Sequence, residues 1–93
     1  ILADLGAEVI KVEPVDGDRT RKLRGFGAGF FGYFNRNKKS LALDADAPEG
    51  RAVLTKLLQS ADVLIENFAP GSMGRRGLGP HHLEKINPRL VYC

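Results

Sequence analysis

The residues of this 93-residue sequence best suited to chemistry gather at a turn, where the adjacent Arg75 and Arg76 follow the dipeptide Pro70-Gly71. The turn comes directly after an apolar stretch and the sequence ENF at residues 66 to 68. A guanidinium group stays charged at any physiological pH and donates paired hydrogen bonds in a planar fork, which suits a phosphate group. The segment therefore predicts a place where an anionic ligand is held.

A glycine-rich hexapeptide, GAGFFG at residues 27 to 32, matches the G-x-G-x-x-G pattern of dinucleotide-binding loops. That pattern holds a pyrophosphate only where it leaves a strand and opens a helix. Here the nearest preceding strand is expected to end near Glu13, and the sequence YFNRNKKS that follows is a poor helix former. We therefore interpret the hexapeptide as a packing loop, or as a loop that contacts another ligand, rather than as a dinucleotide site.

No residues suited to metal binding or nucleophilic catalysis stand at a convincing spacing. The adjacent His81 and His82 would point about 100 degrees apart on a helix, so they cannot hold one metal ion from the same face. Cys93 has no partner histidine and is expected to be a buried strand thiol. We therefore predict neither a catalytic residue nor a metal ligand in this sequence.

Composition and charge narrow the class of protein. Hydrophobic residues make up 43% of the chain and charged residues 27%, and no apolar run reaches the roughly 18 residues that a membrane helix needs. Clustered Lys and Arg residues alternate with aromatic residues at 26 to 34, as in single-strand binders, but the net charge is only +3 and aspartates interrupt the clusters. The single cysteine suits a reducing compartment. We expect a cytoplasmic protein with no membrane and no nucleic-acid partner.

Glycine, proline and apolar residues predict an alternation of helices and strands. A helix is expected to end at Gly6, which should adopt a left-handed conformation. Residues 14 to 36 are expected to form an ordered excursion that contains at most one short helix. A further short helix begins at Pro80 and ends at Asn87-Pro88. Strands are expected at residues 7 to 13, 39 to 44, 61 to 67 and 89 to 93.

The clearest predicted element is a helix over about residues 49 to 60. Asp46 precedes Glu49 by three positions with Pro48 between them, which is the spacing of a capping box. An apolar stripe then follows at helical spacing, formed by Leu54, Leu57, Leu58 and Ala61.

This alternation favours parallel strands joined by right-handed crossovers. We therefore predict an α/β fold, with a Rossmann-like parallel sheet and flanking helices. Such sheets bind ligands outside the carboxyl ends of their strands, where Glu13, the segment after Asp44 and Glu66-Asn67 are expected. The turn with its two arginines then projects onto the ligand-binding edge of the sheet.

Four segments cover nearly the whole chain: LADLGAEVIKVEPVDGDRTR at 2 to 21, NRNKKSLALDADAPEGR at 35 to 51, ADVLIENFAPGSMGRRGLG at 61 to 79 and INPRLVYC at 86 to 93. Together they resemble the N-terminal part of the family III CoA-transferases, a group that includes formyl-CoA transferases, carnitine CoA-transferases and the related α-methylacyl-CoA racemases. The combination of ENF-x-PG with a following GLG is the most specific feature of this resemblance.

The resemblance implies that residues 1 to 93 are an internal piece of a Rossmann-like, CoA-binding large domain, lacking its first strand and its remainder. It also implies an interlocked homodimer that uses an acyl-CoA thioester and a carboxylic acid as substrates, without a prosthetic group. The residues that match the CoA contacts of the family are Leu43, Asn67, Phe68 and Arg75, with Arg75 at a phosphate.

The chain departs from the family pattern near the expected adenine end of CoA. Pro14 and Val15 stand where many relatives carry a basic residue, and Asp46 stands where some carry a lysine. We expect one of three other cations, Arg19, Arg21 or Lys38, to supply the missing contact.

The resemblance also bears on catalysis. Transferases of this family use an aspartate that becomes a mixed anhydride and then an aspartyl-CoA thioester, whereas the racemases use a His/Asp pair on the α-proton. No residue here matches either set, so the 93 residues alone are expected to be inactive and marginally folded. CoA transfer by the longer protein is the predicted function. Racemisation of an acyl-CoA is one alternative, and a non-enzymatic nucleotide or nucleic-acid binding module is another.

Overall fold

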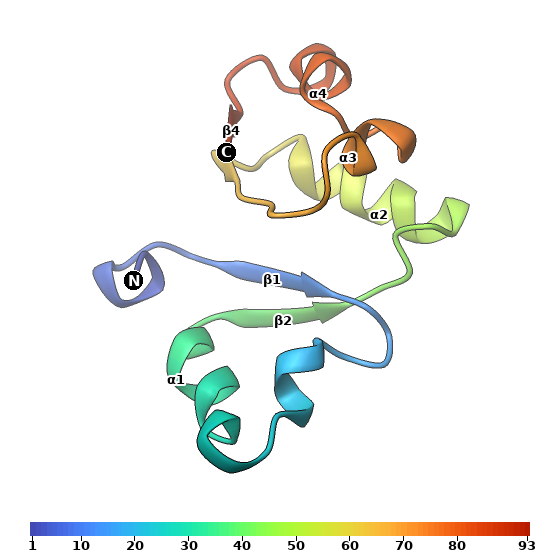
Figure 1. The fold of residues 1–93 in the computed structure, drawn as a ribbon. Coiled ribbons are helices and arrows are strands. Elements are labelled where there is room, and N and C mark those ends of the chain that lie inside the picture. The colour runs from blue at the N-terminus through green and yellow to red at the C-terminus, as the bar shows by residue number, and fades with distance from the viewer. The chain divides into compact units, whose positions relative to one another are not determined.

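The computed structural model describes residues 1 to 93, which divide into two compact units, Ile1–Asp44 and Ala45–Cys93. The first unit is built on two parallel strands, β1 (Ile10–Glu13) and β2 (Lys39–Ala42), drawn in blue and green in Figure 1. Their register pairs Ile10 with Lys39 and Glu13 with Ala42. The carboxyl ends of both strands therefore lie side by side.

The excursion between these strands is more helical than the sequence indicates. It contains two 3-10 helices, Arg19–Lys22 and Gly25–Gly27, followed by α1 (Phe30–Asn35). The GAGFFG hexapeptide begins at Gly27, the last residue of the second 3-10 helix, and continues into the start of α1, and no strand leads directly into it. The interpretation that it is not a dinucleotide fingerprint is thus consistent with its surroundings. At the beginning of the unit, a 3-10 helix (Ala3–Leu5) ends at Gly6 with a φ of 98°, as expected.

The second unit holds three helices and a second pair of parallel strands. The helices are α2 (Pro48–Leu58), α3 (Ser72–Arg75) and α4 (Pro80–Ile86), and β3 (Val63–Leu64) pairs with β4 (Val91–Tyr92). Pro occupies the first position of both α2 and α4, where its missing N–H costs nothing. The short helix α3, which directly follows the Pro-Gly dipeptide, was not predicted.

The hydrophobic core of the protein lies in the second unit. The predicted stripe of α2 is confirmed, because Leu54 and Leu58 are buried while Leu57 and Ala61 pack against the same cluster. Three further side chains, Met73 from α3, Leu78 from the α3–α4 connection and Leu83 from α4, complete it. In the first unit, by contrast, the only buried residue is Glu13.

The predicted capping box of α2 is wrong. The N-cap residue is Ala47, which contributes no side-chain cap, so the helix begins one residue later than a box between Asp46 and Glu49 requires. The Asp46 carboxylate instead accepts a hydrogen bond from Arg76.

The fold is thus mixed α/β with small parallel sheets. The parallel pairing predicted from the alternation of elements is confirmed, but the strands form two separate pairs, β1–β2 and β3–β4, within these residues. None of the helices combines the length and the apolar character needed to cross a membrane.

Candidate ligand-binding site

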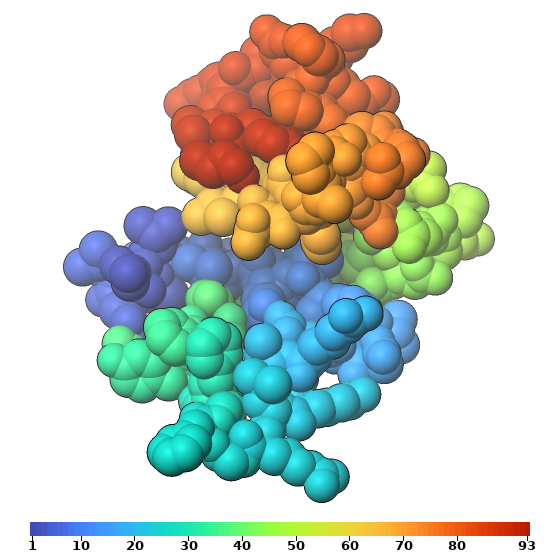
Figure 2. All heavy atoms as spheres, in the orientation of Figure 1, coloured from blue at the N-terminus to red at the C-terminus, as the bar shows by residue number.

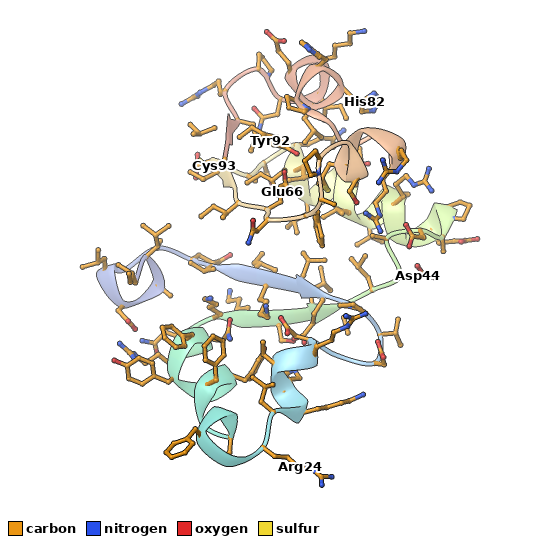
Figure 3. The ribbon with its side chains drawn as sticks, in the orientation of Figure 1. Arg24, Asp44, Glu66, His82, Tyr92 and Cys93 are labelled. Carbon is orange, nitrogen blue, oxygen red and sulfur yellow. The ribbon has the colours of Figure 1, made fainter.

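The Pro-Gly turn, residues 66 to 71, connects the end of β3 to α3 in the second unit. Its first residue is fixed at the strand ends, because the Glu66 N–H donates to the carbonyl of Cys93 at 3.0 Å. One Glu66 carboxylate oxygen accepts the N–H of Phe68 at 2.7 Å, and the other accepts the Tyr92 hydroxyl at 3.3 Å. Figure 3 shows Glu66 and Tyr92 close together at the ends of β3 and β4. The Glu66 side chain therefore helps to fix the backbone conformation of the turn.

The far end of the turn is anchored through α3. Gly71 adopts a φ of 78°, which favours glycine, and its carbonyl accepts the Arg75 N–H at 3.0 Å. Met73 is buried in the core, and its carbonyl accepts the N–H of Leu78 at 2.9 Å. The two arginines are therefore carried on a segment that is tied to the core by its apolar residues.

Arg76 is engaged by three groups. Its Nε donates to Asp46 at 2.7 Å, its Nη1 donates to the Ser72 hydroxyl at 2.6 Å, and its guanidinium carbon lies 5.6 Å from the centroid of the Phe68 ring. The ion pair lowers the pKa of the Asp46 carboxyl below its usual value, chiefly through the hydrogen bond from Arg76. Arg76 is consequently a structural arginine in this structure.

Arg75, one position earlier, is in the opposite situation. It is exposed, and its side chain forms neither a hydrogen bond nor an ion pair. Asn67 and Phe68 on the same turn are also exposed, Phe68 with 61% of its surface accessible. The structure thus brings three of the predicted CoA contacts onto one short segment, with an uncompensated guanidinium, a free amide and an accessible ring.

The other two predicted contacts, Leu43 and Lys38, lie in the first unit at opposite ends of β2. Leu43 follows the carboxyl end of the strand, where its N–H donates to the carbonyl of Glu13 at 3.0 Å. Lys38 precedes the amino end, and its Nζ donates to Asn35 at 2.9 Å. Leu43 therefore lies at the edge where a parallel sheet binds ligands, and Lys38 is separated from it by the length of the strand. Contact of either residue with CoA stays a prediction.

Glu13 forms the main polar cluster of the first unit. Arg21 donates to both carboxylate oxygens, from Nε at 2.8 Å and from Nη2 at 2.7 Å. The Ser40 hydroxyl and the Asp18 N–H donate as well, at 2.6 and 2.8 Å. Together these donors, Arg21 first, hold the pKa of Glu13 far below its usual value. The Arg21 guanidinium also lies 3.8 Å from the centroid of the Phe31 ring.

This cluster bears on the cations expected at the adenine end of CoA. Both sides of the Arg21 fork are engaged by Glu13, so Arg21 is occupied in this structure. Arg19 is exposed on the 3-10 helix of the excursion and has no ion pair. In the space-filling view of Figure 2, side chains of the excursion, drawn in blue to cyan, extend into solvent. Figure 3 shows the Arg24 side chain directed outward at the tip of the excursion.

Sequence reasoning missed both ion pairs, Glu13–Arg21 and Asp46–Arg76. The partners are separated by 8 and 30 positions, so no helical or strand periodicity connects them. A usable signal was the placement of Glu13 at the end of an apolar strand, where a carboxylate needs donors if the strand end is buried.

The histidines and the cysteine do not form a chemical site. His81 and His82 are exposed at the start of α4, and no group of three His, Cys, Asp or Glu side chains is placed to hold a metal ion. The expectation that Cys93 is buried is wrong, because β4 ends at Tyr92 and the thiol is exposed. Two open depressions of about 280 and 310 Å³ lie along α4, and neither includes Asn67, Phe68 or Arg75.

Comparison with known proteins gives a consistent result. The chain is 46% identical over 96 residues to a formyl-CoA:oxalate CoA-transferase of Afipia carboxidovorans, covering 98% of this chain and 23% of that protein. It is 45% identical over 97 residues to an acetyl-CoA:oxalate CoA-transferase of Acetobacter aceti, covering 100% of this chain and 25% of that protein. The chain thus spans about a quarter of the length of these relatives.

Solved structures agree with the sequence comparison. A CAIB/BAIF family protein from Brucella suis matches 99% of this chain and 26% of its own, with a TM-score of 0.90 and 43% identity. A hypothetical protein from Mycobacterium tuberculosis matches 98% of this chain and 26% of its own, with a TM-score of 0.87 and 41% identity. The sequence profile described as CoA-transferase family III matches residues 1 to 93. The chain therefore belongs to CoA-transferase family III.

Proposed function

We propose that this chain is part of an enzyme that moves CoA from an acyl-CoA thioester to a carboxylic acid, and that it supplies part of the CoA-binding site. The observation that carries the proposal is the contrast between two neighbouring arginines. Arg76 is neutralised by Asp46, whereas Arg75 is exposed on the same segment as Asn67 and Phe68 and has no anionic partner. A free guanidinium on the carboxyl side of a parallel strand suits a phosphate group of CoA.

Three of the six aspartates of the chain are held in ion pairs, which supports assigning the chemistry to other residues. Asp4 is paired with Arg36 at 2.8 Å, Asp18 with Lys11 at 2.7 Å, and Asp46 with Arg76. The hydrogen bond from Lys11, followed by those from Thr20, lowers the pKa of Asp18 to about 2. A carboxylate held in this way is a poorer nucleophile toward a thioester. We propose that the attacking aspartate lies outside these 93 residues.

The proposal includes the setting of the enzyme. The chain is part of a larger Rossmann-like, CoA-binding domain, and the protein is an interlocked homodimer of the cytoplasm. Contact of Lys38 and Leu43 with CoA belongs to the same proposal. Light scattering on the full-length protein tests the dimer, because a monomer that transfers CoA at full rate would contradict it.

The reaction is tested with the full-length protein and a panel of acyl-CoAs. Two curated relatives are named for formyl-CoA or acetyl-CoA with oxalate, so these donors and this acceptor come first. We expect oxalyl-CoA to form, and mass spectrometry to detect a CoA adduct on one aspartate outside residues 1 to 93. Incorporation of solvent deuterium at the α-carbon of a branched acyl-CoA, with no adduct, would instead indicate a racemase.

Binding is tested separately by changing Arg75 to Ala in the full-length protein. Loss of a charge-assisted phosphate contact should weaken CoA binding by about 1.5 to 3 kcal/mol. Arg89→Ala is the matched control, because Arg89 is an exposed arginine of the same unit without an ion pair. An unchanged dissociation constant for Arg75→Ala would remove the phosphate assignment.

The nucleic-acid alternative has its own test. Retention of single-stranded oligonucleotides by the protein at physiological salt would favour this alternative.

A further inference from the structure

We infer that Arg76 is a positioning residue for the CoA site and does not itself bind the ligand. It fixes the Phe68 ring and α3, and thereby the direction in which Asn67 and Arg75 face CoA. The inference deepens the proposed function and rests on it. It divides the two adjacent arginines into one that binds and one that holds the binding segment in place.

The geometry of Arg76 is that of a bridge. Its partners come from three places in the second unit: Asp46 before α2, Ser72 at the start of α3, and Phe68 within the Pro-Gly turn. Removing Arg76 would break the link that it makes between the segment from 68 to 72 and the beginning of α2.

The charge of Arg76 is already compensated. Asp46 lies 2.7 Å from its Nε, so an approaching phosphate meets a neutral pair at this position rather than a cation. Arg75 is then the one cation of the segment whose field is not cancelled by a neighbouring carboxylate. The acidic partner Asp46 therefore holds Arg76 in a structural contact.

Phe68 is the group whose orientation depends most on Arg76. Its backbone is fixed by Glu66, which accepts the Phe68 N–H, but its ring is largely exposed and has few neighbours to select a rotamer. The guanidinium carbon lies 5.6 Å from the centroid of this ring, within the range of a cation–π interaction, which favours one ring orientation. An exposed aromatic ring can pack against a ligand at low entropic cost only if it is already held in the binding orientation.

Lysine cannot replace arginine in this role. An ammonium group has no planar fork, so it cannot donate in two fixed directions to Asp46 and Ser72 while staying near the Phe68 ring. A lysine at position 76 would keep the positive charge but would lose the simultaneous contacts with Asp46, Ser72 and Phe68. Arg76→Lys therefore separates an electrostatic role from a positioning role.

The experiment is isothermal titration of the full-length protein with CoA at two salt concentrations. We expect Arg75→Ala to weaken binding about tenfold or more and to reduce its salt dependence, because a phosphate contact is lost. We expect Arg76→Lys, and the double variant of Arg76→Ala with Asp46→Asn, to weaken binding by about threefold to tenfold each, with the salt dependence of the wild type retained because both keep the net charge of the pair. Arg89→Ala should behave as the wild type.

The outcomes separate the possibilities. Wild-type affinity in Arg76→Lys would show that Arg76 acts on the ligand by charge and would overturn the inference. If Arg76→Lys does not fold, the double variant of Arg76→Ala with Asp46→Asn carries the same test, and unchanged affinity there would also overturn it. If the wild type does not bind CoA, the proposed function fails. Tryptophan emission of Phe68→Trp, with and without Arg76→Lys, still reports whether Arg76 orients this position, and identical spectra would contradict that.

Discussion

Arg21 donates from Nε and Nη2 to different carboxylate oxygens of Glu13, at 2.8 and 2.7 Å, and so links the excursion to the end of β1. Glu13 is the only buried residue of the first unit, and it takes the place that an apolar residue fills in an ordinary core. A polar cluster thus organises a unit in which none of the hydrophobic side chains is fully buried.

Glu13→Ala should lower the free energy of unfolding of the full-length protein by about 1 to 3 kcal/mol. The substitution leaves the Ser40 hydroxyl and the Asp18 N–H without their acceptor, in addition to breaking the contact with Arg21. Denaturant titration measures the change. Glu8→Ala is the control, because the Glu8–Lys39 pair is exposed on both sides and should contribute little. Equal effects of the two substitutions would show that Glu13 is not central to the unit.

The ion pairs of the first unit predict loss of stability in acid. Lys11 and Thr20 lower the folded-state pKa of Asp18 from 3.8 to about 2, and the pKa of Glu13 is also depressed. A depressed carboxylate pKa stabilises the folded state above the unfolded-state pKa, and this contribution is lost as the pH falls toward the folded-state pKa.

Asp18→Asn tests this dependence. The variant should be less stable than the wild type at neutral pH, and the difference should shrink as the pH falls from about 5 to 3, because the wild type becomes protonated in its unfolded state. Denaturant titrations at several pH values measure it. A difference that stays constant over this range would mean that the Lys11–Asp18 pair does not control the acid response.

Much of the fold could be predicted because local signals and packing agree. In α2, Pro48 at the first position and leucines at helical spacing point to the same helix that the core requires. The two strand pairs are parallel, as the alternation of elements predicts. The Pro-Gly turn was placed correctly after β3, since Gly71 needs a positive φ.

The parts that could not be predicted depend on long-range contacts. Asp46 and Glu49 have the spacing of a capping box, but Asp46 binds Arg76 from a distant segment and Ala47 takes the N-cap position. The adjacent arginines look equivalent in sequence, and only the location of Asp46 distinguishes the paired one from the free one. Charge partners across 30 positions leave no periodic pattern to read.

Gly71→Ala should weaken CoA binding more than Gly77→Ala. Both glycines have positive φ values, 78° and 69°, so an added side chain should cost about 1 to 2 kcal/mol of stability at either site. At Gly71 the new methyl group would also lie 3.2 Å from Nη1 of Arg75, whereas at Gly77 it would meet nothing within 4 Å. Calorimetric titration with CoA compares the two. Equal losses of affinity would show that Arg75 need not lie close to Gly71.

Asn87 joins α4 to the end of α2, and its replacement should destabilise the second unit. Its amide nitrogen donates to the carbonyls of Leu58 and Ala61, at 3.0 and 2.8 Å. Asn87→Ala removes both donors and should lower the free energy of unfolding by about 1 to 3 kcal/mol. Asn87→Asp keeps the shape of the side chain, but a carboxylate can only accept hydrogen bonds, and it adds negative charge at the carbonyl end of a helix. The free energy of unfolding should therefore fall at least as much as in Asn87→Ala. Denaturant titration of both variants measures this. Wild-type stability in Asn87→Asp would mean that the side chain fills space there and does not act as a donor.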